Sequence, residues 1–229
     1  MKIFELEGKT AVVTGGAKGI GAATVKLLRE AGASVHSLDI ESGCDVTDEA
    51  QVKAAFARIG ELDILVNNAG RAVRKTALEL GSEEWDQVQD LNVKAVFFCS
   101  RNAVALMKKR GGGAIVNLAS IMGLSGGIYP NASYQASKGA VVNLTRALAL
   151  EWAADNIRVN AVAPTYVRTD LTVPIFGNPE MMKTVMAHTP LGRFPEPEEI
   201  AAAIVYLCGP AARCVTGVIL PVDSGYLAR

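Results

Sequence analysis

A tyrosine and a lysine stand four residues apart in the stretch YQASKGAVV, at positions 134 and 138. In a helix, side chains at i and i+4 lie on the same face and would be neighbours. A free tyrosine has a pKa of about 10, and a nearby cation favours its phenolate form. The pair could therefore act as a general acid/base. It could equally be an ordinary surface pair, and the spacing alone does not choose between the two.

A glycine-rich stretch, TGGAKGIG, occupies residues 14–21 directly after the apolar residues AVV. Glycines at 15, 19 and 21 allow a tight turn in which backbone N–H groups approach a pyrophosphate at a helix N-terminus. The spacing differs from GxGxxG, the commonest dinucleotide fingerprint, and such a loop alone is as typical of a structural turn. Between a strand and a helix at the start of a βαβ unit, it predicts a dinucleotide site.

Asp39 stands at the end of the second predicted strand, 24 residues after Gly15. A carboxylate there accepts hydrogen bonds from the adenosine ribose and repels a 2′-phosphate, although an aspartate can also simply cap a turn. Lys18, inside the glycine loop, could instead attract an extra phosphate. We give Asp39 more weight, because its carboxylate would have to be desolvated against any phosphate placed beside it. The expected cofactor is NAD, with NADP less favoured.

Several motifs, in family order, resemble those of the short-chain dehydrogenases/reductases. The matches are TGxxxGxG at 14–21, NNAG at 67–70, the helix asparagine at Asn92, the active-site serine at Ser120, and YxxxK at Tyr134 and Lys138. The resemblance covers nearly the whole chain. It implies an NAD(P)-dependent enzyme that interconverts a secondary alcohol and a ketone by hydride transfer.

The resemblance also implies four catalytic residues: Asn92, Ser120, Tyr134 and Lys138. Tyr134 would be the general acid/base, and Ser120 would hold the substrate oxygen. Lys138 would lower the pKa of Tyr134 and bind the nicotinamide ribose, and Asn92 would hold a water that links Lys138 to solvent. Lowering a tyrosine pKa to ~7 requires about 4 kcal/mol. Lysine and the oxidised nicotinamide together could supply this in a water-poor cleft.

The expected cofactor contacts come from the glycine loop, from Asp39 and from the family motifs, in which DV at 45–46 resembles the pair beside the adenine and PTYVRT resembles PGxxxT. They are Gly15, Lys18, Gly19, Ile20, Gly21, Asp39, Asp45, Val46, Asn67, Ala69, Gly70, Tyr134, Lys138, Pro164, Val167 and Thr169.

The chain departs from the family pattern at four places, one of which is the interval of 14 residues from Ser120 to Tyr134, about one more than is common. Only five residues separate Asp39 from Asp45, where the family usually has a full helix, so we expect a trimmed adenine edge. Thr165 replaces the usual glycine after Pro164, and Ser224 replaces a glycine near the C-terminus. The last two positions shape the substrate side of the cleft, so they weaken any inference of the substrate from similarity.

Short apolar runs alternate with segments of helical period along the chain. The expected strands are 11–14, 34–39, 64–67, 114–118, 158–161 and 218–221, and the expected helices are 19–31, 48–59, 82–109, 134–153 and 197–208. Runs that are apolar on both faces, such as AVVT and DILV, predict a parallel sheet covered on both sides. We therefore expect an α/β fold, a single doubly wound Rossmann domain over 1–229.

The segment 171–195, with four prolines, is the least regular part of the sequence. It follows a predicted strand end, where open α/β sheets place their ligand clefts. We interpret it as a substrate loop or lid, and the alternative is a plain connector.

Composition excludes several other classes of protein. The 229 residues hold 23 basic and 23 acidic side chains without a marked basic cluster, which argues against a nucleic-acid partner. The four cysteines form no CxxC pair and there are only two histidines, so we expect no metal site. The start has no apolar signal-like segment and no stretch reads as a membrane helix. We expect a cytoplasmic protein.

The substrate and the partners are less closely defined. The motifs resemble enzymes of polyols and sugar acids, but also 3-oxoacyl-carrier-protein reductases, for which Arg71, Arg74 and Lys75 could form a basic entrance. We expect a small polar alcohol or ketone substrate. A non-catalytic dinucleotide sensor is a remote alternative, because the Tyr/Lys pair is intact. Helices 82–109 and 134–153 are apolar over more than one stripe, which predicts a homotetramer or dimer built through them.

Overall fold

A six-stranded parallel sheet forms the centre of the computed structural model, which describes residues 2–228. The strand order is β2-β1-β3-β4-β5-β6, and all five neighbouring pairs are parallel. The strands are β1 (Thr10–Thr14), β2 (Ser34–Leu38), β3 (Ile64–Asn67), β4 (Gly113–Leu118), β5 (Ile157–Pro164) and β6 (Ile219–Val222). This order confirms the predicted doubly wound α/β fold, because it reverses between β1 and β3.

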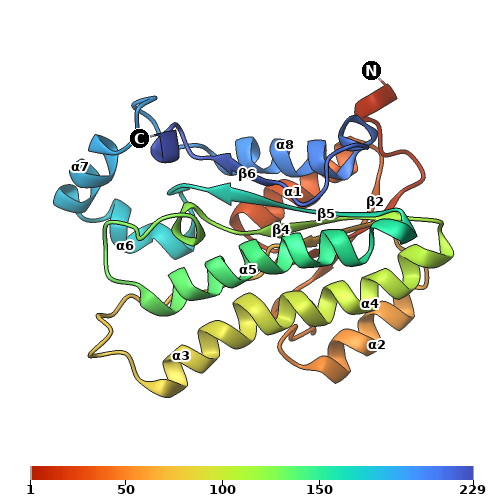
Figure 1. Ribbon diagram of the computed structural model, residues 1–229, viewed down its shortest axis with the longest axis horizontal. Helices are drawn as coiled ribbons and strands as arrows, with labels where there is room; N and C mark the ends of the chain where they lie inside the picture. Colours follow the sequence, from red (N-terminus) through yellow and green to blue (C-terminus); the bar gives the residue numbers. More distant parts are fainter. Residues whose placement is uncertain (1, 229) are drawn as a thin grey trace.

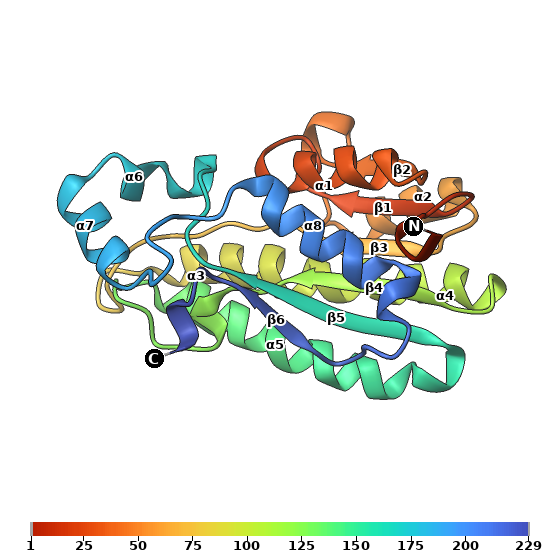
Figure 2. The same ribbon diagram turned by 90° about the horizontal axis from the view of Figure 1, so that it is seen from above.

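Helices cover both faces of this sheet (Figures 1 and 2). Helices α1 and α8 lie on one face, and α2, α4 and α5 lie on the other. The eight α-helices of the described chain are α1 (Gly19–Glu30), α2 (Glu49–Ile59), α3 (Ser82–Gln89), α4 (Ala95–Lys109), α5 (Ala132–Glu151), α6 (Val173–Phe176), α7 (Pro179–Ala187) and α8 (Pro197–Cys208).

Alternate residues of each strand enter two different cores. In β1, Val12 packs with the helices α2, α4 and α5, whereas Ala11 and Val13 pack with α1 and α8. Successive side chains of a strand point to opposite faces, so a strand buried on both sides must be apolar at every position. This is why the runs AVV and ILV identify the central strands.

The connection after β2 is shorter than a helix. Strand β2 ends at Leu38, one residue before the predicted end, and Asp39 caps a single 3₁₀ turn over Ile40–Ser42. The Asp39 carboxylate accepts from the Glu41 backbone N–H at 3.2 Å, and the Ser42 hydroxyl accepts from the Asp39 N–H at 2.9 Å. One turn therefore stands where the family pattern has a helix, as the short interval to Asp45 predicts.

The long predicted helix over 82–109 contains an irregularity. Between α3 and α4, residues Asp90–Lys94 form a π-helical turn that includes Asn92. The Asn92 side chain is drawn inward, where it bonds both the N–H and the C=O of Arg71. Single π turns inside helices are frequent at functional sites.

The segment 171–195 is more regular than predicted. It contains α6 and α7, with Pro174 and Pro179 in the first turn of each. Proline needs no partner for its missing N–H there and pre-sets the helical φ, so these prolines begin helices rather than break them. An apolar cluster that includes Ile175 and Val185 fastens both helices to the end of the sheet. In Figure 2 they project beyond the strands.

Residues 2–228 contain neither a bilayer-spanning helix nor a metal-binding cluster. None of the helices there is long and apolar enough to span a bilayer. The same residues hold no group of three or more His, Cys, Asp or Glu side chains arranged to bind a metal.

Candidate active site

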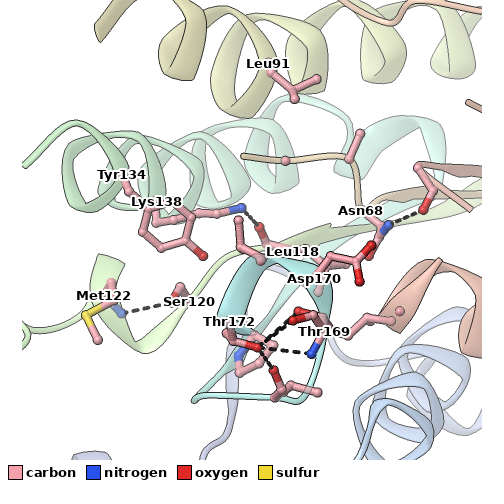
Figure 3. A pocket seen from close by; sticks show the side chains of 18 of the residues that line it. Asn68, Leu91, Leu118, Ser120, Met122, Tyr134, Lys138, Thr169, Asp170 and Thr172 are labelled. Atoms are coloured by element: carbon pink, nitrogen blue, oxygen red, sulfur yellow. Dashed lines mark hydrogen bonds between the residues drawn. The ribbon is translucent and has the colours of Figure 1, made fainter. Parts of the chain in front are cut away.

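A cleft of about 390 Å³ opens at the carboxyl ends of the parallel strands. Its wall includes residues that directly follow β1, β2, β3, β4 and β5, namely Gly15, Asp39, Asn68, Ala119 and Thr165. Parallel strands all end at the same edge of the sheet, so segments far apart in sequence meet there. Figure 3 shows side chains of this cleft.

Most of the predicted site residues line this cleft. They are Gly15, Lys18, Gly19, Ile20, Asp39, Asp45, Val46, Ala69, Gly70, Ser120, Tyr134, Lys138, Pro164, Val167 and Thr169. Three predicted residues, Gly21, Asn67 and Asn92, lie behind its wall.

Gly21 acts through packing. A Cβ atom at Gly21 would lie 2.0 Å from the Gly15 carbonyl oxygen, so only glycine lets α1 approach the loop this closely. Gly15 and Gly19 themselves have φ of +62° and +53°, the left-handed region that favours glycine. The loop geometry therefore requires the three glycines, but only two of them line the cleft.

Asn67 does not line the cleft, and its neighbour Asn68 does. The Asn67 amide donates to Ser100 Oγ at 3.0 Å and to Asn117 Oδ1 at 2.8 Å, inside the core. Asn68 Nδ2 donates to the backbone oxygens of Thr14 and Gly15, at 3.0 and 2.8 Å. Asn67, predicted as a cofactor contact, therefore lies outside the cleft wall, because the last strand residue points into a core and the next one reaches the edge.

The glycine loop fits a pyrophosphate. Helix α1 begins at Gly19 without a side-chain cap from Lys18 and without an acidic residue in its first turn. Its first N–H groups are therefore not bonded by a cap, and the helix dipole adds a partial positive charge beside them. A Cβ at Gly15 would lie 2.9 Å from Ala69 Cα, so the loop has the close approach that a dinucleotide cradle needs.

At the far end of the cleft, acids surround the place expected for the adenosine ribose. Asp39 Oδ2 accepts from the Ala17 N–H at 3.3 Å. Lys18 forms an ion pair with Glu41 at 2.9 Å, and this carboxylate raises the pKa of Lys18. The cation of the glycine loop is thus already paired with an acid of this chain.

Helix α5 carries Tyr134 and Lys138 into the cleft (Figure 3). The Lys138 ammonium lies 5.6 Å from the centre of the Tyr134 ring and donates to the Leu118 carbonyl oxygen at 2.5 Å. Ser120 follows β4, and its hydroxyl accepts from the Met122 N–H at 3.1 Å. The i, i+4 spacing on the helix and the end of a strand therefore bring together three of the four predicted catalytic residues.

The pKa values of this group differ from the expectation. Burial raises the pKa of Tyr134, while a hydrogen-bonding contact with Ser120 and the charge of Arg74 act in the lowering direction. Burial also lowers the pKa of Lys138 to about 8. The expected lowering of the tyrosine pKa requires Lys138 together with the oxidised nicotinamide. In the chain alone, burial of Tyr134 has the larger effect, and the Lys138 ammonium is directed to the Leu118 carbonyl. The chain alone favours a protonated tyrosine.

Asn92 lies behind the cleft wall and bonds residues next to the site. It is fully buried, and its amide donates to the Arg71 carbonyl and to Ser137 Oγ, both at 2.9 Å. Its Oδ1 accepts from the Arg71 N–H at 2.9 Å. Both amide hydrogens are thus committed to protein atoms that join the segment after NNAG to helix α5. A water bound by Asn92 would have to use the second lone pair of Oδ1 or the backbone.

Further residues outside the predicted catalytic and cofactor-binding sets also line the cleft, and polar side chains among them are Asn68, Arg74, Asn131, Thr165 and Tyr166. Among the described side chains, Arg74 makes no hydrogen bond or ion pair. Burial raises the pKa of both Tyr134 and Tyr166, and the charge of Arg74 opposes this rise. Its neighbour Lys75 is instead paired with Glu84 at 2.5 Å. The arginines after NNAG were visible in the sequence, but no pattern indicated which of them faces the cleft.

Comparisons with known proteins agree with this geometry. A family model described as enoyl-(acyl carrier protein) reductase matches residues 39–227. The chain is 43% identical to galactitol 2-dehydrogenase (L-tagatose-forming) of Cereibacter sphaeroides, over 98% of this chain and 97% of the relative. It is 37% identical to 2-dehydro-3-deoxy-D-gluconate 5-dehydrogenase of Dickeya dadantii, over 100% and 99%.

A solved structure has a similar fold. It is a gluconate 5-dehydrogenase from Burkholderia cenocepacia in complex with NADP and tartrate. The TM-score is 0.94 at 30% identity, and the match covers 100% of this chain and 98% of that one.

Proposed function

Because the chain belongs to the short-chain dehydrogenase/reductase family and is an NAD(P)-dependent oxidoreductase of CH–OH groups, we propose that it oxidises or forms a secondary alcohol on a small sugar acid. The observation that carries the choice of an acid is Arg74, a cation in the cleft wall that no carboxylate of the described chain neutralises. Galactitol and gluconate dehydrogenases among the relatives support the wider class of polyols and sugar acids.

Side chains of the protein would donate and accept the proton that the reaction moves on the substrate oxygen. Tyr134 is the general acid/base that exchanges a proton with the substrate oxygen, and Ser120 holds that oxygen with its hydroxyl. The nicotinamide, when bound, accepts or donates the hydride. The glycine loop, Asp39 and Lys138 hold the cofactor, and Asn92 keeps the segment after NNAG in register with α5. A protonated Tyr134 is suited to donating a proton to a forming alkoxide.

Substituting Arg74 tests the substrate class. We expect the wild-type kcat/KM for an aldonate to exceed that for the alditol of the same chain length, and Arg74→Met to reduce this preference about 100-fold. A charge-assisted hydrogen bond contributes roughly 1.5–3 kcal/mol, and each 1.36 kcal/mol is about tenfold. The measurement is steady-state kinetics on matched acid and alditol pairs.

Arg71→Met is the matched control, because Arg71 is exposed and outside the cleft wall. Its preference for the acid should equal that of the wild type. Equal rates on acid and alditol in the wild type, with Arg74→Met affecting both alike, would show that the substrate is a neutral polyol.

A 3-oxoacyl-carrier-protein reductase is the second candidate, and its support is that the matching family model, enoyl-(acyl carrier protein) reductase, also names an acyl carrier protein. A carrier protein would require a basic entrance, and in the structure Lys75 is paired with Glu84 while Arg74 faces the cleft. A 3-oxoacyl thioester therefore belongs in the same panel of substrates. If it is turned over faster than any sugar acid, the carrier-protein reading replaces ours. If no substrate of the panel is turned over while NADH still binds, the result would support a non-catalytic dinucleotide sensor.

We further propose that NAD is preferred over NADP, although the similar gluconate dehydrogenase holds NADP. Asp39 and Glu41 place two carboxylates beside the adenosine end, and Glu41 pairs the one lysine of the loop. Replacing Asp39 by Ser should raise the NADP/NAD ratio of kcat/KM about 30-fold. A charge repulsion of about 2 kcal/mol is then removed, at ~1.36 kcal/mol for each tenfold change.

Glu41→Gln should raise the same ratio by a smaller factor, because it frees Lys18 for a phosphate. Glu49→Gln removes an exposed carboxylate that pairs with Arg101 elsewhere, and it should leave the ratio unchanged. A wild-type ratio above one would contradict the assignment of NAD.

The segment 171–195 is proposed to close over the substrate as a lid. Ile175 of α6 and Met181 of α7 line the cleft, and the Tyr129 hydroxyl donates to the Met181 carbonyl at 3.2 Å. Limited proteolysis within this segment should slow when cofactor and substrate are both present. Equal cleavage rates with and without the ligands would argue for a plain connector.

Assembly through the long helices is proposed as well. Trp85 of α3, Phe97 of α4 and Leu150 of α5 are exposed apolar side chains on those helices. Covering such residues is a usual reason for association, and we propose a homotetramer or a dimer. Light scattering that gives a mass of about 24 kDa, that of one chain, would contradict this.

A further inference from the structure

Buried polar atoms without a partner are rare in the described chain. Only four side-chain atoms there are buried and unbonded: Asn67 Oδ1, Asn131 Oδ1, Ser133 Oγ and Thr165 Oγ1. Two of these residues, Asn131 and Thr165, line the cleft. A buried polar group without a hydrogen bond destabilises the fold. Its presence in the wall of a binding site indicates that a ligand completes the bond.

Thr165 stands directly after β5, at the position that the family motif reserves for glycine. Its backbone N–H bonds the Val222 carbonyl at 3.3 Å, which ties the backbone to β6. The residue is 8% exposed, and its hydroxyl has no partner. A glycine would give the same backbone without a hydroxyl. The side chain therefore adds a polar group to the cleft wall, and no protein atom uses it.

Asn131 occupies the N-cap position of α5, three residues before Tyr134. Asparagine at this position commonly accepts a hydrogen bond from the first turn of its helix. Here no side-chain cap bond is formed, and Oδ1 stays unbonded in the wall of the cleft. An amide oxygen can only accept, so it fits a hydroxyl donor and disfavours a carboxylate.

We propose that Thr165 and Asn131 are specificity-determining residues that bind non-reacting hydroxyl groups of a polyhydroxylated substrate. The proposal rests on the proposed oxidation of a sugar acid and divides the recognition of that substrate. Arg74 binds the carboxylate of the substrate, and Tyr134 and Ser120 bind the reacting oxygen. Thr165 and Asn131 bind hydroxyl groups that lie between these two ends or beyond them. A substrate that lacks such a hydroxyl leaves the buried groups unpaired, and sites of this kind reject it strongly.

The test compares an aldonate with its monodeoxy analogues, one missing hydroxyl at a time, in kcat/KM. The wild type should prefer the full aldonate over at least one analogue by about 100-fold. Thr165→Val, nearly equal in shape, should reduce that preference about tenfold, and Thr165→Ser should keep it. Asn131→Leu should likewise reduce the preference in kcat/KM for the full aldonate over at least one monodeoxy analogue. The missing hydroxyl of that analogue need not be the one that Thr165 binds.

Thermal stability separates recognition from a structural role. Thr165→Val removes an unbonded buried hydroxyl, so its Tm should equal or exceed that of the wild type. Thr145→Val is the matched control. Thr145 is also buried, but its hydroxyl bonds the Val141 carbonyl at 2.8 Å and the Asn117 amide at 3.0 Å. This variant should have a lower Tm and an unchanged preference.

Several results would overturn the proposal. One is a Tm of Thr165→Val that falls as far as that of Thr145→Val. Another is a raised Kd for NADH with no change in substrate preference, which would assign the hydroxyl to the cofactor. Turnover of aldonates with the same preference in all variants overturns the subsite alone. Failure of the wild type to turn over any sugar acid overturns the proposed function and the subsite together.

Discussion

Replacing Tyr134 by Phe should lower kcat about 1000-fold, while NADH still binds. The substitution removes only the hydroxyl that exchanges a proton with the substrate oxygen. The ring stays in the cleft wall beside the Lys138 ammonium, 5.6 Å from its centre, so the packing of α5 is kept. Steady-state rates in both directions, together with NADH titration by fluorescence, measure the two effects separately.

Tyr129→Phe is the matched control for this result. Tyr129 also lines the cleft, but its hydroxyl donates to the Met181 carbonyl of α7. Its loss should change kcat by less than about tenfold, the worth of one neutral hydrogen bond. Near-normal turnover by Tyr134→Phe would remove the tyrosine from its role as general acid/base.

The pH profiles of kcat/KM for oxidation and for reduction test whether Tyr134 acts as the base in one direction and as the acid in the other. Burial holds the pKa of Tyr134 above its ordinary value. Alcohol oxidation needs the deprotonated tyrosine, so kcat/KM for oxidation should rise with pH. Ketone reduction needs the protonated form and should fall as the pH rises past the same value. Tyr134→Phe should flatten both limbs. A wild-type profile for oxidation that does not rise with pH would exclude a tyrosine base.

Lys138→Met should make the protein more stable and nearly inactive. Lys138 is 4% exposed, and burial lowers its pKa from 10.5 to about 8. Keeping this ammonium charged at pH 7 costs on the order of 3 kcal/mol at ~1.36 kcal/mol for each pKa unit. Methionine removes that cost and loses the hydrogen bond to the Leu118 carbonyl. We expect Tm to rise by several degrees and kcat/KM to fall about 1000-fold.

The stability difference should depend on pH in a defined window. The folded-state pKa of Lys138 lies below the unfolded value, so between about 8 and 10.5 the unfolded chain binds more protons. The wild type therefore gains stability as pH rises through that range, and its disadvantage against Lys138→Met shrinks. Below pH 8 the difference should be constant and largest. Thermal melts of both proteins from pH 6 to 10 measure it.

Lys94→Met is the control, because Lys94 is exposed and pairs with Asp90 one turn away. Its effect should stay within about 0.5 kcal/mol at every pH. A lower Tm for Lys138→Met at pH 7 would mean that the bond to Leu118 outweighs the burial of the charge.

The sequence predicted those parts of the site that depend on local backbone rules. Apolar runs on both faces identify β1 and β3, and left-handed glycines identify the loop at 14–21. The spacing of Tyr134 and Lys138 places both on one helix face. Each of these features is decided within a few residues, so the sequence alone is enough to recognise it.

Other features were decided only by segments that are distant in sequence. Asn68 lines the cleft where Asn67 was expected, because the Asn67 side chain at the end of β3 points into a core built with β4 and α4. The pKa of Tyr134 is raised because the tyrosine itself is buried, and the Lys138 ammonium is directed to the carbonyl of Leu118, 20 residues earlier. Neither the depth of burial nor the partner is a local property.

The sequence by itself determined the fold class and the dinucleotide loop of this protein, since periodicity and glycine positions act over short distances, and the resemblance of its motifs to a known family indicated the oxidoreductase chemistry. The tertiary structure alone decided which charges and hydroxyls are left without partners in the cleft. Glu84 pairs with Lys75 and no ion pair forms at Arg74, and the Thr165 hydroxyl has no protein partner. Substrate choice depends on those unsatisfied groups, and they exist only once the strand ends meet.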